Sequence, residues 1–252
     1  MIRWNAARRR IPLFKRLIPS LNRAWARLVW RHDVRTIGFR GALWLLAHRN
    51  RVDREIAFYG DYEDAQLSRF LARLGHGDVD LVLDIGANFG LYAILAAVHS
   101  PVERIIAFEP DARNRDQLAT QRWLNPKARR VEIDPRAVSA ASGEVIFQSY
   151  PDTSTGQSRI ADTGEAVTAV ALDEIFDLAQ RRIMIKIDVE GHELAVLTGA
   201  RRLLSQNQCW LQVEIWPAQR AAAEAFLSEL GYYAAAATGD DQVFIRKGDI
   251  LQ

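Results

Sequence analysis

The sequence predicts an α/β fold: a mostly parallel sheet of seven strands with one reversed strand near the edge, preceded by an N-terminal helical extension. Its 252 residues, 49% of them hydrophobic, can bury the core of one such domain. Past the N-terminal region the hydrophobic pattern alternates between the strand period and the helix period, which is typical of a parallel sheet covered by helices. The turn sequence "TGDD" at residues 238–241 joins the last two strands and is short enough for an antiparallel hairpin.

The individual elements follow from local patterns. Buried-strand patterns fall at residues 81–85, 104–108, 130–134, 182–187, 209–215, 231–236 and 242–246. Helical patterns fall at 90–99, 112–124, 191–205 and 217–230, each long enough for a right-handed crossover between parallel strands. Residues 140–170 are rich in Ser, Thr, Asp and Gly, so we expect a loop or small hairpin there.

The N-terminal region differs from the rest of the chain in charge. The formal net charge is only +2, yet residues 1–32 hold nine Arg or Lys and no acid. The stretch "SLNRAWARLVWRH" places apolar side chains on one helical stripe and arginines on another: Leu21, Trp25, Leu28 and Val29 against Arg23, Arg27 and Arg31. We therefore divide the chain into a basic amphipathic helical extension, residues 1–50, and a main domain, residues 51–252.

Three interpretations of this extension are open. Residues 1–32 have the features of a segment that lies on an anionic membrane surface as a peripheral contact. Alternatively, the helix caps the main domain and keeps its arginines in water. An Arg-rich, acid-free leader is also a feature of organellar transit peptides.

The composition indicates the cellular compartment in which we expect the protein. The single cysteine, Cys209, excludes a disulfide framework and a cysteine-based zinc site, and it suits a reducing compartment. The longest apolar runs are far short of the ~20 residues that span a bilayer, and no secretory signal pattern occurs. We expect a cytoplasmic protein, with peripheral attachment to the inner face of the membrane as the alternative.

The glycine loop after the first sheet strand is the place where an open parallel sheet binds ligands. In "LVLDIGANFGLYAI", residues 81–94, a dinucleotide fingerprint counted from Gly86 needs glycines at 88 and 91, where the chain has Asn88 and Leu91. A phosphate-binding P-loop is also excluded, because no Gly-Lys-Ser or Gly-Lys-Thr follows.

The residues that are present favour a cationic ligand that carries hydroxyl groups. Asp84 is at the end of the strand, and Gly86, Asn88 and Gly90 let the backbone approach a ligand closely. Glu109 follows the next strand, 23 residues after Gly86, near the ~20-residue offset at which a carboxylate binds the ribose of an adenine nucleoside. S-adenosylmethionine has an ammonium group, a ribose and no phosphate, and it is the cofactor that we expect.

Five blocks along the chain carry a family resemblance: "LDIGANFGLYA", "AFEPDARN", "AVSAASGEVIF", "VTAVALDEIF" and "IKIDVEGHELAVLTGARRLL". In this order they resemble the FkbM family of class I S-adenosylmethionine-dependent methyltransferases, over residues 59–216, beginning at "YGDYEDAQLSRFL". The resemblance implies a Rossmann-like fold with the reversed strand next to the sheet edge. It also implies O-methylation of a hydroxyl group on a sugar, glycan or natural product, such as a bacterial glycan or secondary metabolite. Residues 51–252 are then the methyltransferase domain.

The resemblance also implies roles for the cofactor residues. Asp84, Gly86, Asn88 and Gly90 would hold the methionine part, Glu109 would bind the ribose, and the neighbourhood of Ala137 would contact the adenine. Asn88 stands where many methyltransferases of this class have glycine, and Asn tolerates a positive φ better than most residues.

The block "IKIDVEGHEL" brings polar side chains to the edge where the sulfonium would lie. Asp188 and His192 are the candidate catalytic residues, because the acceptor hydroxyl loses a proton as it is methylated and a positioned base assists. The alternative is structural: neighbouring glutamates stabilise the N-terminus of the next helix through its dipole, and His192 is solvated. Lys186 lies two residues before Asp188, on the same face of the strand, and is a candidate ion-pair partner for it.

Glu214, at the end of the next strand, is a candidate for substrate or metal binding beside Asp188. Two carboxylates at one edge can hold Mg²⁺ with water, but no full ligand set is recognisable, so no metal ligand is assigned. A nucleic-acid base methylase usually shows Asn or Asp followed by two prolines and an aromatic residue, where this chain has "DVEG". We therefore expect a small-molecule or glycan hydroxyl acceptor and no nucleic-acid partner. The alternative is a non-catalytic, cofactor-binding or membrane-associated scaffold with the same fold.

Overall fold

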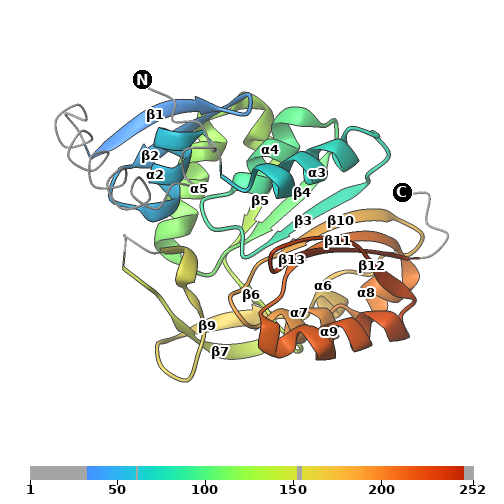
Figure 1. The fold of residues 1–252 in the computed structure, drawn as a ribbon. Helices are drawn as coiled ribbons and strands as arrows, with labels where there is room; N and C mark the ends of the chain where they lie inside the picture. Colours follow the sequence, from blue (N-terminus) through green and yellow to red (C-terminus); the bar gives the residue numbers. More distant parts are fainter. Residues whose placement is uncertain (1–32, 61, 152–154, 247–252) are drawn as a thin grey trace, which may run out of the picture.

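The structure, a computed structural model, describes residues 33–60, 62–151 and 155–246 (Figure 1). Its centre is a seven-stranded sheet with the order β12-β13-β11-β10-β3-β4-β5. Strand β13 runs antiparallel to both of its neighbours, whereas β11, β10, β3, β4 and β5 pair in parallel. The predicted fold class, with one reversed strand next to the edge, is confirmed. The strands are β3 (Leu81–Ile85), β4 (Arg104–Phe108), β5 (Val131–Asp134), β10 (Arg182–Ile187), β11 (Gln208–Glu214), β12 (Tyr232–Thr238) and β13 (Asp241–Arg246).

The central strands are buried on both faces, which is why they are near-continuous hydrophobic runs in the sequence. In β3, Val82 packs into one hydrophobic cluster, while Leu83 and Ile85 pack into another. Helices cover the sheet on both sides (Figure 1). Because the strands from β11 to β5 run in parallel, their carboxyl ends all lie at one edge of the sheet. On one side lie α2 (Arg51–Tyr59), α3 (Asp64–Leu74), α4 (Leu91–His99) and α5 (Ala112–Leu124), and on the other α6 (Leu172–Ile175), α7 (Glu193–Thr198), α8 (Arg201–Gln206) and α9 (Pro217–Glu229).

The single helix predicted over residues 191–205 is two helices, α7 and α8. Gly199 follows α7, and a Cβ at this position would lie 2.1 Å from the carbonyl oxygen of Ser139. The carboxylate of Asp173 accepts hydrogen bonds from the backbone N–H groups of Arg202 and Leu203, and so caps α8 from another element. The local pattern contains no sign of this break, because both stabilising partners are distant in sequence.

Residues 137–170 build a second, smaller sheet. It contains β6 (Ala137–Val138), β7 (Gly143–Gln148), β8 (Arg159–Ile160) and β9 (Glu165–Val170), in the order β6-β9-β7-β8. Strands β7 and β9 pair antiparallel, with β8 between them in sequence, and β6 and β8 pair at the two outer sides. The region is thus a four-stranded sheet and not the loop or small hairpin expected there. This sheet brings Ala137 and the segment around Ser158 to the carboxyl edge of the main sheet.

Residues 34–47 form an antiparallel hairpin, β1 (Val34–Phe39) and β2 (Ala42–Ala47), and not the helix predicted there. Its side chains alternate, because Trp44 and Leu46 are buried in the core while Leu43 is exposed. The side-chain amide of Gln121, in α5, accepts a hydrogen bond from the Leu45 N–H and donates one to its carbonyl oxygen, both at 2.8 Å. The hairpin thus packs into the main domain, and the predicted boundary at residue 50 is wrong for these residues.

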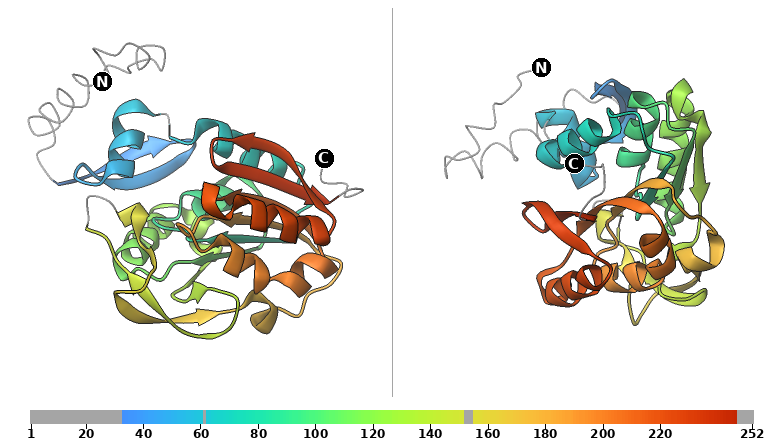
Figure 2. Two further views of the ribbon diagram at one scale, coloured as in Figure 1. Left: turned by 60° about the horizontal axis from the view of Figure 1, so that its bottom comes forward. Right: turned by 90° about the vertical axis from the view of Figure 1, so that its right-hand side faces the viewer.

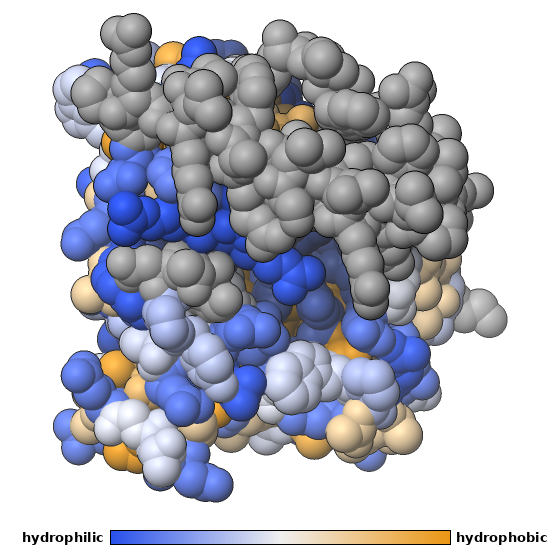
Figure 3. Space-filling model, turned by 60° about the vertical axis from the view of Figure 1, so that its left-hand side comes forward, coloured by the Kyte–Doolittle hydropathy of each residue, from blue (hydrophilic) through white to orange (hydrophobic). Residues whose placement is uncertain are grey.

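The predictions for residues 1–32, a basic amphipathic helix and its contact with a membrane, lie outside the described residues. In the parts of the chain that the structure describes, no helix has the length and hydrophobicity needed to cross a bilayer. The hairpin lies on the opposite side of the domain from α9 (Figure 2). On the face shown in Figure 3 the described residues are mostly hydrophilic, and hydrophobic ones occupy small separate areas.

Candidate active site

The loop between β3 and α4 is fixed against the ends of both neighbouring strands. The N–H groups of Gly86 and Ala87 donate to the carbonyl oxygen of Phe108, at the end of β4, each at 3.0 Å. The N–H of Asp188, just past β10, donates to the carbonyl oxygen of Ile85 at 2.9 Å. A Cβ at Gly86, whose φ is +78°, would lie 1.8 Å from the carbonyl oxygen of Asp188. The two loops can therefore meet only because this residue is glycine.

Asn88 and Gly90 continue the loop in the left-handed region, with φ of +52° and +89°. The expectation that Asn88 tolerates a positive φ is confirmed. Gly90 immediately precedes α4, and a Cβ on it would lie 2.0 Å from the side chain of Leu118 in α5. Gly90 therefore serves the packing of α4 against α5.

Glu109 follows β4 and is only 4% exposed. Its Oε2 accepts a hydrogen bond from the N–H of Asn88 at 2.7 Å. Its Oε1 accepts one from the N–H of Asp111 at 2.8 Å and one from Nδ2 of Asn114 at 3.4 Å. Burial, partly offset by these hydrogen bonds, raises the pKa of Glu109 to about 7. The carboxylate is held in one orientation and has lone pairs left for a ligand.

Asp84 is not in the lining of the two cavities described below, which differs from its predicted role. It is 2% exposed, and its Oδ2 accepts a hydrogen bond from the N–H of Ala93, in α4, at 2.9 Å. Burial raises its pKa to about 7, against the opposing effects of this hydrogen bond and of Lys186. Asp84 thus orients α4 and the glycine loop from below.

A cavity of about 600 Å³, including its open mouth, lies beside the glycine loop, and we call it the loop cavity. Gly86, Asn88, Glu109 and Ala137, four of the predicted cofactor residues, line it. Asn114 also lines it, is 3% exposed, and has an Oδ1 atom without a hydrogen-bond partner. An unpaired buried acceptor beside a buried carboxyl group suits a ligand that brings hydroxyl or N–H donors.

A second cavity, of about 1260 Å³ including its open mouth, shares a wall with the loop cavity. Asn88, Gly156, Asp188 and Glu190 line both, so ligands in the two cavities would meet at these residues. Among the described residues that line the second cavity, Arg51 is the only basic one. We call it the acidic cavity because five carboxyl groups line it: Glu55, Glu63, Asp188, Glu190 and Glu214.

Lys186 lies beneath the acidic cavity and is 1% exposed. Its Nζ is 3.0 Å from Oδ2 of Asp241 and 3.9 Å from Oδ2 of Asp188, so the candidate ion pair with Asp188 is present. Burial disfavours the ammonium form, but the surrounding carboxylates, with Asp188 and Asp241 foremost, outweigh burial and raise the pKa of Lys186 above its usual range. The result is a fixed positive charge directly behind Asp188.

Asp188 changes the proton affinity of the carboxyl groups around it. Its charge, together with burial, raises the pKa of Glu214 to about 8. Burial first, and then Asp188, raise the pKa of Glu190 to about 7. Glu63, just before α3, accepts a hydrogen bond from the Tyr92 hydroxyl at 2.7 Å, and burial raises its pKa. Carboxyl groups that exchange protons near neutral pH are suited to general acid and base chemistry.

His192 lies away from both cavities. Its Nε2 is 2.9 Å from Oγ of Ser139, which follows β6, and burial lowers its pKa. His192 precedes α7 and is not in the lining of either cavity. The prediction of His192 as a catalytic base is not supported by this geometry, because the ring is directed to Ser139.

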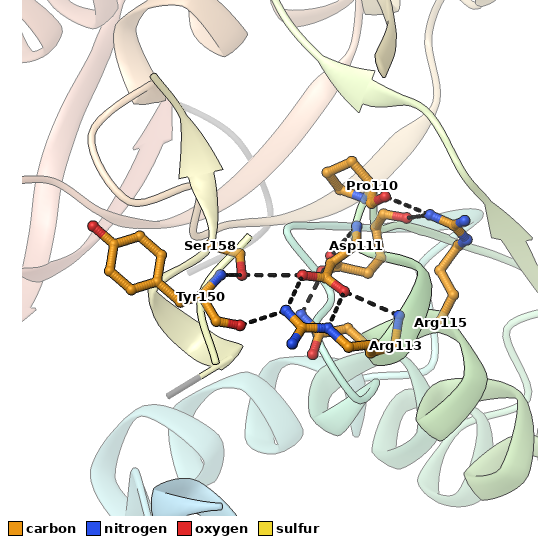
Figure 4. A network of polar contacts seen from close by, with 8 residues as sticks. Pro110, Asp111, Arg113, Arg115, Tyr150 and Ser158 are labelled. Atoms are coloured by element: carbon orange, nitrogen blue, oxygen red, sulfur yellow. Dashed lines mark hydrogen bonds and ion pairs between the residues drawn. The ribbon is translucent and has the colours of Figure 1, made fainter. Parts of the chain in front are cut away.

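Asp111, the N-cap of α5, links the loop cavity to the segment after β7 (Figure 4). Its Oδ2 accepts hydrogen bonds from Oγ of Ser158 at 3.1 Å and from Nη2 of Arg113 at 3.0 Å. Ser158 and Arg113 are both also hydrogen-bonded to the backbone of Tyr150. The Tyr150 N–H donates to Ser158 Oγ at 3.0 Å, and the Tyr150 carbonyl oxygen accepts from Arg113. Burial acts against the ionised form, but Arg113 and the other hydrogen bonds outweigh it and lower the pKa of Asp111. One carboxylate thus positions Ser158 in the wall of the loop cavity.

Asp188 and Glu214 are the two carboxylates that we considered as a possible, but not favoured, Mg²⁺ site. Within the described ranges, no group of three or more His, Cys, Asp or Glu side chains is arranged to hold a metal ion. Asp188 and Glu214 both interact with the charge of Lys186.

Sequence reasoning missed several residues that line the cavities. Glu55 and Glu63 come from the region before β3. Glu190 lies in the block "IKIDVEGHEL", whose polar side chains we expected at this edge, but it was not among the candidate catalytic or binding residues. Asn114 lies in the quoted block "AFEPDARN", five residues after Glu109. That spacing carries it into the first turns of α5, so its side chain turns back toward Glu109.

Comparisons with known proteins found one family model and several relatives. The model described as "Methyltransferase FkbM domain" matches residues 84–233, more than half of the chain. The hexuronic acid methyltransferase AglP of Haloferax volcanii is 29% identical over 140 residues, which are 54% of this chain and 56% of AglP. The AMB antimetabolite synthetase AmbE of Pseudomonas aeruginosa is 40% identical over 86 residues, which are 34% of this chain and 4% of AmbE.

The chain thus spans about half the length of AglP and a small part of AmbE. Among solved structures, the methyltransferase FkbM of Methylobacillus flagellatus KT is similar with a TM-score of 0.48 and 21% sequence identity. The similarity covers 67% of this chain and 44% of that one.

Proposed function

Because the chain belongs to the FkbM family of methyltransferases, we propose that it transfers a methyl group from S-adenosylmethionine to a hydroxyl oxygen of a sugar, glycan or natural product. The observation that carries this proposal is the pair of cavities that meet at Asp188. One cavity offers the hydrogen-bonding groups that suit a nucleoside, and the other offers carboxylates that suit a hydroxyl-bearing acceptor. The Haloferax volcanii relative is named for hexuronic acid, which makes sugars the first acceptors to test.

S-adenosylmethionine fits the loop cavity in its hydrogen-bonding groups. Glu109 is suited to accept hydrogen bonds from the ribose hydroxyls, and the unpaired Oδ1 of Asn114 from a further hydroxyl or amino donor. Ala137 and Phe147 give the same cavity an apolar wall for the adenine ring. When bound, the cofactor supplies a methyl group activated by its sulfonium charge.

The protein's own contribution is to align the acceptor hydroxyl and to take its proton. Asp188 lines both cavities, so we assign it as the group that meets the acceptor oxygen. The hydroxyl proton passes to the Asp188 carboxylate as the oxygen takes the methyl group. Lys186, with its Nζ 3.9 Å from Asp188, keeps a positive charge behind this carboxylate. Glu214, with its pKa raised to about 8, is largely protonated at neutral pH and can donate a hydrogen bond to the acceptor.

The test is methyl transfer by the full chain from methyl-labelled S-adenosylmethionine to a panel of mono- and oligosaccharides, followed by mass spectrometry. We expect label on an acceptor oxygen together with stoichiometric S-adenosylhomocysteine. The label should survive mild alkali, because a methyl ether is stable under conditions that hydrolyse a methyl ester.

The competing function is a non-catalytic scaffold that binds the cofactor. It would be favoured if calorimetry detected S-adenosylmethionine binding and no acceptor of the panel gained a methyl group. Hydrolysis of all the label by alkali would instead indicate a carboxyl methyltransferase and contradict the assignment to a hydroxyl oxygen.

A further inference from the structure

A buried network of hydrogen bonds reaches the acidic cavity at Glu63 and indicates how the acceptor is held. We propose that Glu63 is a further acceptor-binding residue and that Tyr92 is the positioning residue that holds its carboxyl group. Asp188 then takes the proton of the hydroxyl to be methylated, and Glu63 binds a second hydroxyl of the same molecule, an inference that rests on the proposed function. The acceptor class is a polyhydroxylated ring, such as a sugar, and not a compound with an isolated hydroxyl.

The network runs through four buried side chains, each at most 5% exposed: Lys186, Asp241, Gln212 and Tyr92. Nζ of Lys186 lies 3.0 Å from Oδ2 of Asp241, and the same oxygen accepts a hydrogen bond from Nε2 of Gln212 at 3.0 Å. Nε2 of Gln212 also donates to the Tyr92 hydroxyl at 3.1 Å. The Tyr92 hydroxyl in turn donates to Oε2 of Glu63 at 2.7 Å. The position of the Glu63 carboxyl group is therefore set from inside the core.

The available donors determine the direction of each hydrogen bond in this network. The ammonium group of Lys186 can only donate, so Asp241 accepts. The amide hydrogens of Gln212 go to Asp241 and to the Tyr92 oxygen, which leaves the single Tyr92 hydrogen for Glu63. Glu63 thus accepts one hydrogen bond from the core, and a carboxyl group keeps further lone pairs for a hydroxyl of a ligand in either protonation state.

The Tyr92 ring is held by packing as well as by its hydroxyl. It meets Phe70 edge to face, with ring centres 5.0 Å apart and planes at 87°. Nζ of Lys186 lies 5.3 Å from the centre of the Tyr92 ring, within the range of a cation–π contact. Tyr92 is therefore a rigid support, and Glu63 adjusts to it.

Glu63 has a local conformation that is unusual for its position before α3. Its φ is +48°, in the left-handed region that is costly for a residue other than glycine. A carboxylate at a helix N-terminus is stabilised by the free N–H groups there, yet the Glu63 side chain makes no capping hydrogen bond. The side chain instead bonds to Tyr92 and lines the acidic cavity. Such strained residues are found where function requires them.

Glu63 and Asp188 serve the same cavity. Both line the acidic cavity, and both interact with the charge of Lys186. An acceptor with a hydroxyl at Asp188 could still rotate about that single contact. A second hydrogen bond, to Glu63, stops this rotation and so aligns the reacting oxygen with the methyl group.

The experiment measures the binding of glucose, galactose and mannose to the full chain saturated with S-adenosylhomocysteine, by saturation-transfer NMR. Glu63→Ala should weaken the tightest of the three by about tenfold, and Tyr92→Phe by about threefold or more. Because Tyr92 acts through Glu63, the double variant should bind no more weakly than Glu63→Ala alone. Calorimetry should show that the affinity of each variant for S-adenosylhomocysteine changes by less than about twofold.

Two further variants control for a purely structural effect. Tyr232→Phe removes the hydroxyl of another buried tyrosine, which donates to the carbonyl oxygen of Leu204 at 2.9 Å, and should leave sugar binding unchanged. Glu63→Gln keeps an oxygen for the Tyr92 hydroxyl and should retain most of the affinity that Glu63→Ala loses. Thermal unfolding reports whether each variant is folded. Glu63 is partly exposed, so its variants test the binding role even if Tyr92→Phe does not fold.

Monodeoxy analogues of the tightest sugar identify the hydroxyl that Glu63 binds. The analogue that lacks this hydroxyl should bind equally to the native protein and to Glu63→Ala. Four results would each overturn the inference: native sugar affinity in folded Glu63→Ala, additive effects in the double variant, a loss on Glu63→Ala that is the same for every analogue, or binding of none of the three sugars.

Methyl transfer to the same sugars separates this inference from the proposed function. Sugar binding that depends on Glu63 and Tyr92, without methylation, would contradict the proposed function and leave the role of Glu63 standing. Methylation of a sugar hydroxyl with a KM for the sugar that neither variant changes would contradict the role of Glu63 and leave the methyl transfer standing.

Discussion

The substitution Glu109→Gln tests the assignment of the ribose-binding residue, because it keeps the shape of the side chain and removes its charge. In the native protein the two carboxylate oxygens accept hydrogen bonds from the N–H groups of Asn88 and Asp111, at 2.7 and 2.8 Å. An amide has one oxygen, so its NH₂ group would face one of these donors. We therefore expect an effect on stability and a separate effect on cofactor affinity.

The two effects have different sizes. An unpaired N–H group at this buried position should lower the free energy of unfolding by about 1–3 kcal/mol. In the complex, two hydrogen bonds from the ribose to a charged group, each worth about 1.5–3 kcal/mol, would become neutral ones worth about 0.5–1.5 kcal/mol. The loss of roughly 1 kcal/mol or more per bond corresponds to an affinity that is lower by about tenfold to a hundredfold.

The same assignment predicts how the affinity depends on pH. Burial raises the pKa of Glu109 to about 7 in the free protein, and ribose hydroxyls donate to the ionised form. Binding must therefore expel the proton that the carboxyl group holds below this pH. The affinity should fall by up to about tenfold for each pH unit below about 7 and should level off above it. Glu109→Gln removes the group and with it this component of the pH dependence.

Calorimetric titration of S-adenosylhomocysteine from about pH 5.5 to about pH 8.5 measures the cofactor affinity and its pH dependence. Thermal unfolding measures the effect on stability and reports whether the variant is folded. Glu132→Gln, on the exposed surface of β5, is a control for loss of one carboxylate. A folded Glu109→Gln variant with native affinity, or with the same pH dependence as the native protein, would refute the ribose assignment.

Three further predictions concern catalysis, the cavity wall and the N-terminal region. Asp188→Asn should bind the cofactor with near-native affinity and lose about a hundredfold or more in turnover, and normal turnover would reassign Asp188 to structure. Asp111→Asn keeps a helix cap but loses the hydrogen bond from Ser158, which lines the loop cavity, so the KM for S-adenosylmethionine should rise more than kcat falls. Ser158→Ala should do the same, and the double variant should be non-additive in kinetic assays; additive effects would show that the contact does not position the wall. Residues 1–32 should give salt-sensitive flotation with anionic liposomes that a chain starting at Arg35 lacks, since each basic residue adds about 1 kcal/mol near such a surface. Equal flotation of both chains would favour a helical cap.

The sheet could be predicted from the sequence because its strands are buried on both faces. Strands such as β3 and β10 are near-continuous apolar runs, each followed by a glycine or an acidic residue, so their bounds are visible locally. The features that were wrong depend on distant partners. Trp44 and Gln121 draw residues 34–47 into a hairpin on α5, and Asp173 stabilises the break between α7 and α8.

The candidate site was predictable to the extent that strand ends determine it. Glu109 and Asp188 reach the cavities because each directly follows a parallel strand. The sequence did not predict the direction in which a side chain at the site points. His192 turns to Ser139, and Asp84 turns to the N–H of Ala93, because partners from other elements fix them there.

The charges around Lys186 depend on one another, and this dependence explains why the site and the core of the fold share residues. A lysine that is 1% exposed would lose its proton unless carboxylates outweighed the cost of burial. Asp241, on the reversed strand β13, is one of these, at 3.0 Å. Asp188, at the cavity, is another, at 3.9 Å. Loss of Lys186 would leave Asp241 buried without a counter-charge, a situation that is strongly destabilising. The reversed strand of this fold therefore does more than complete the sheet, because it supplies the carboxylate that holds a positive charge behind Asp188.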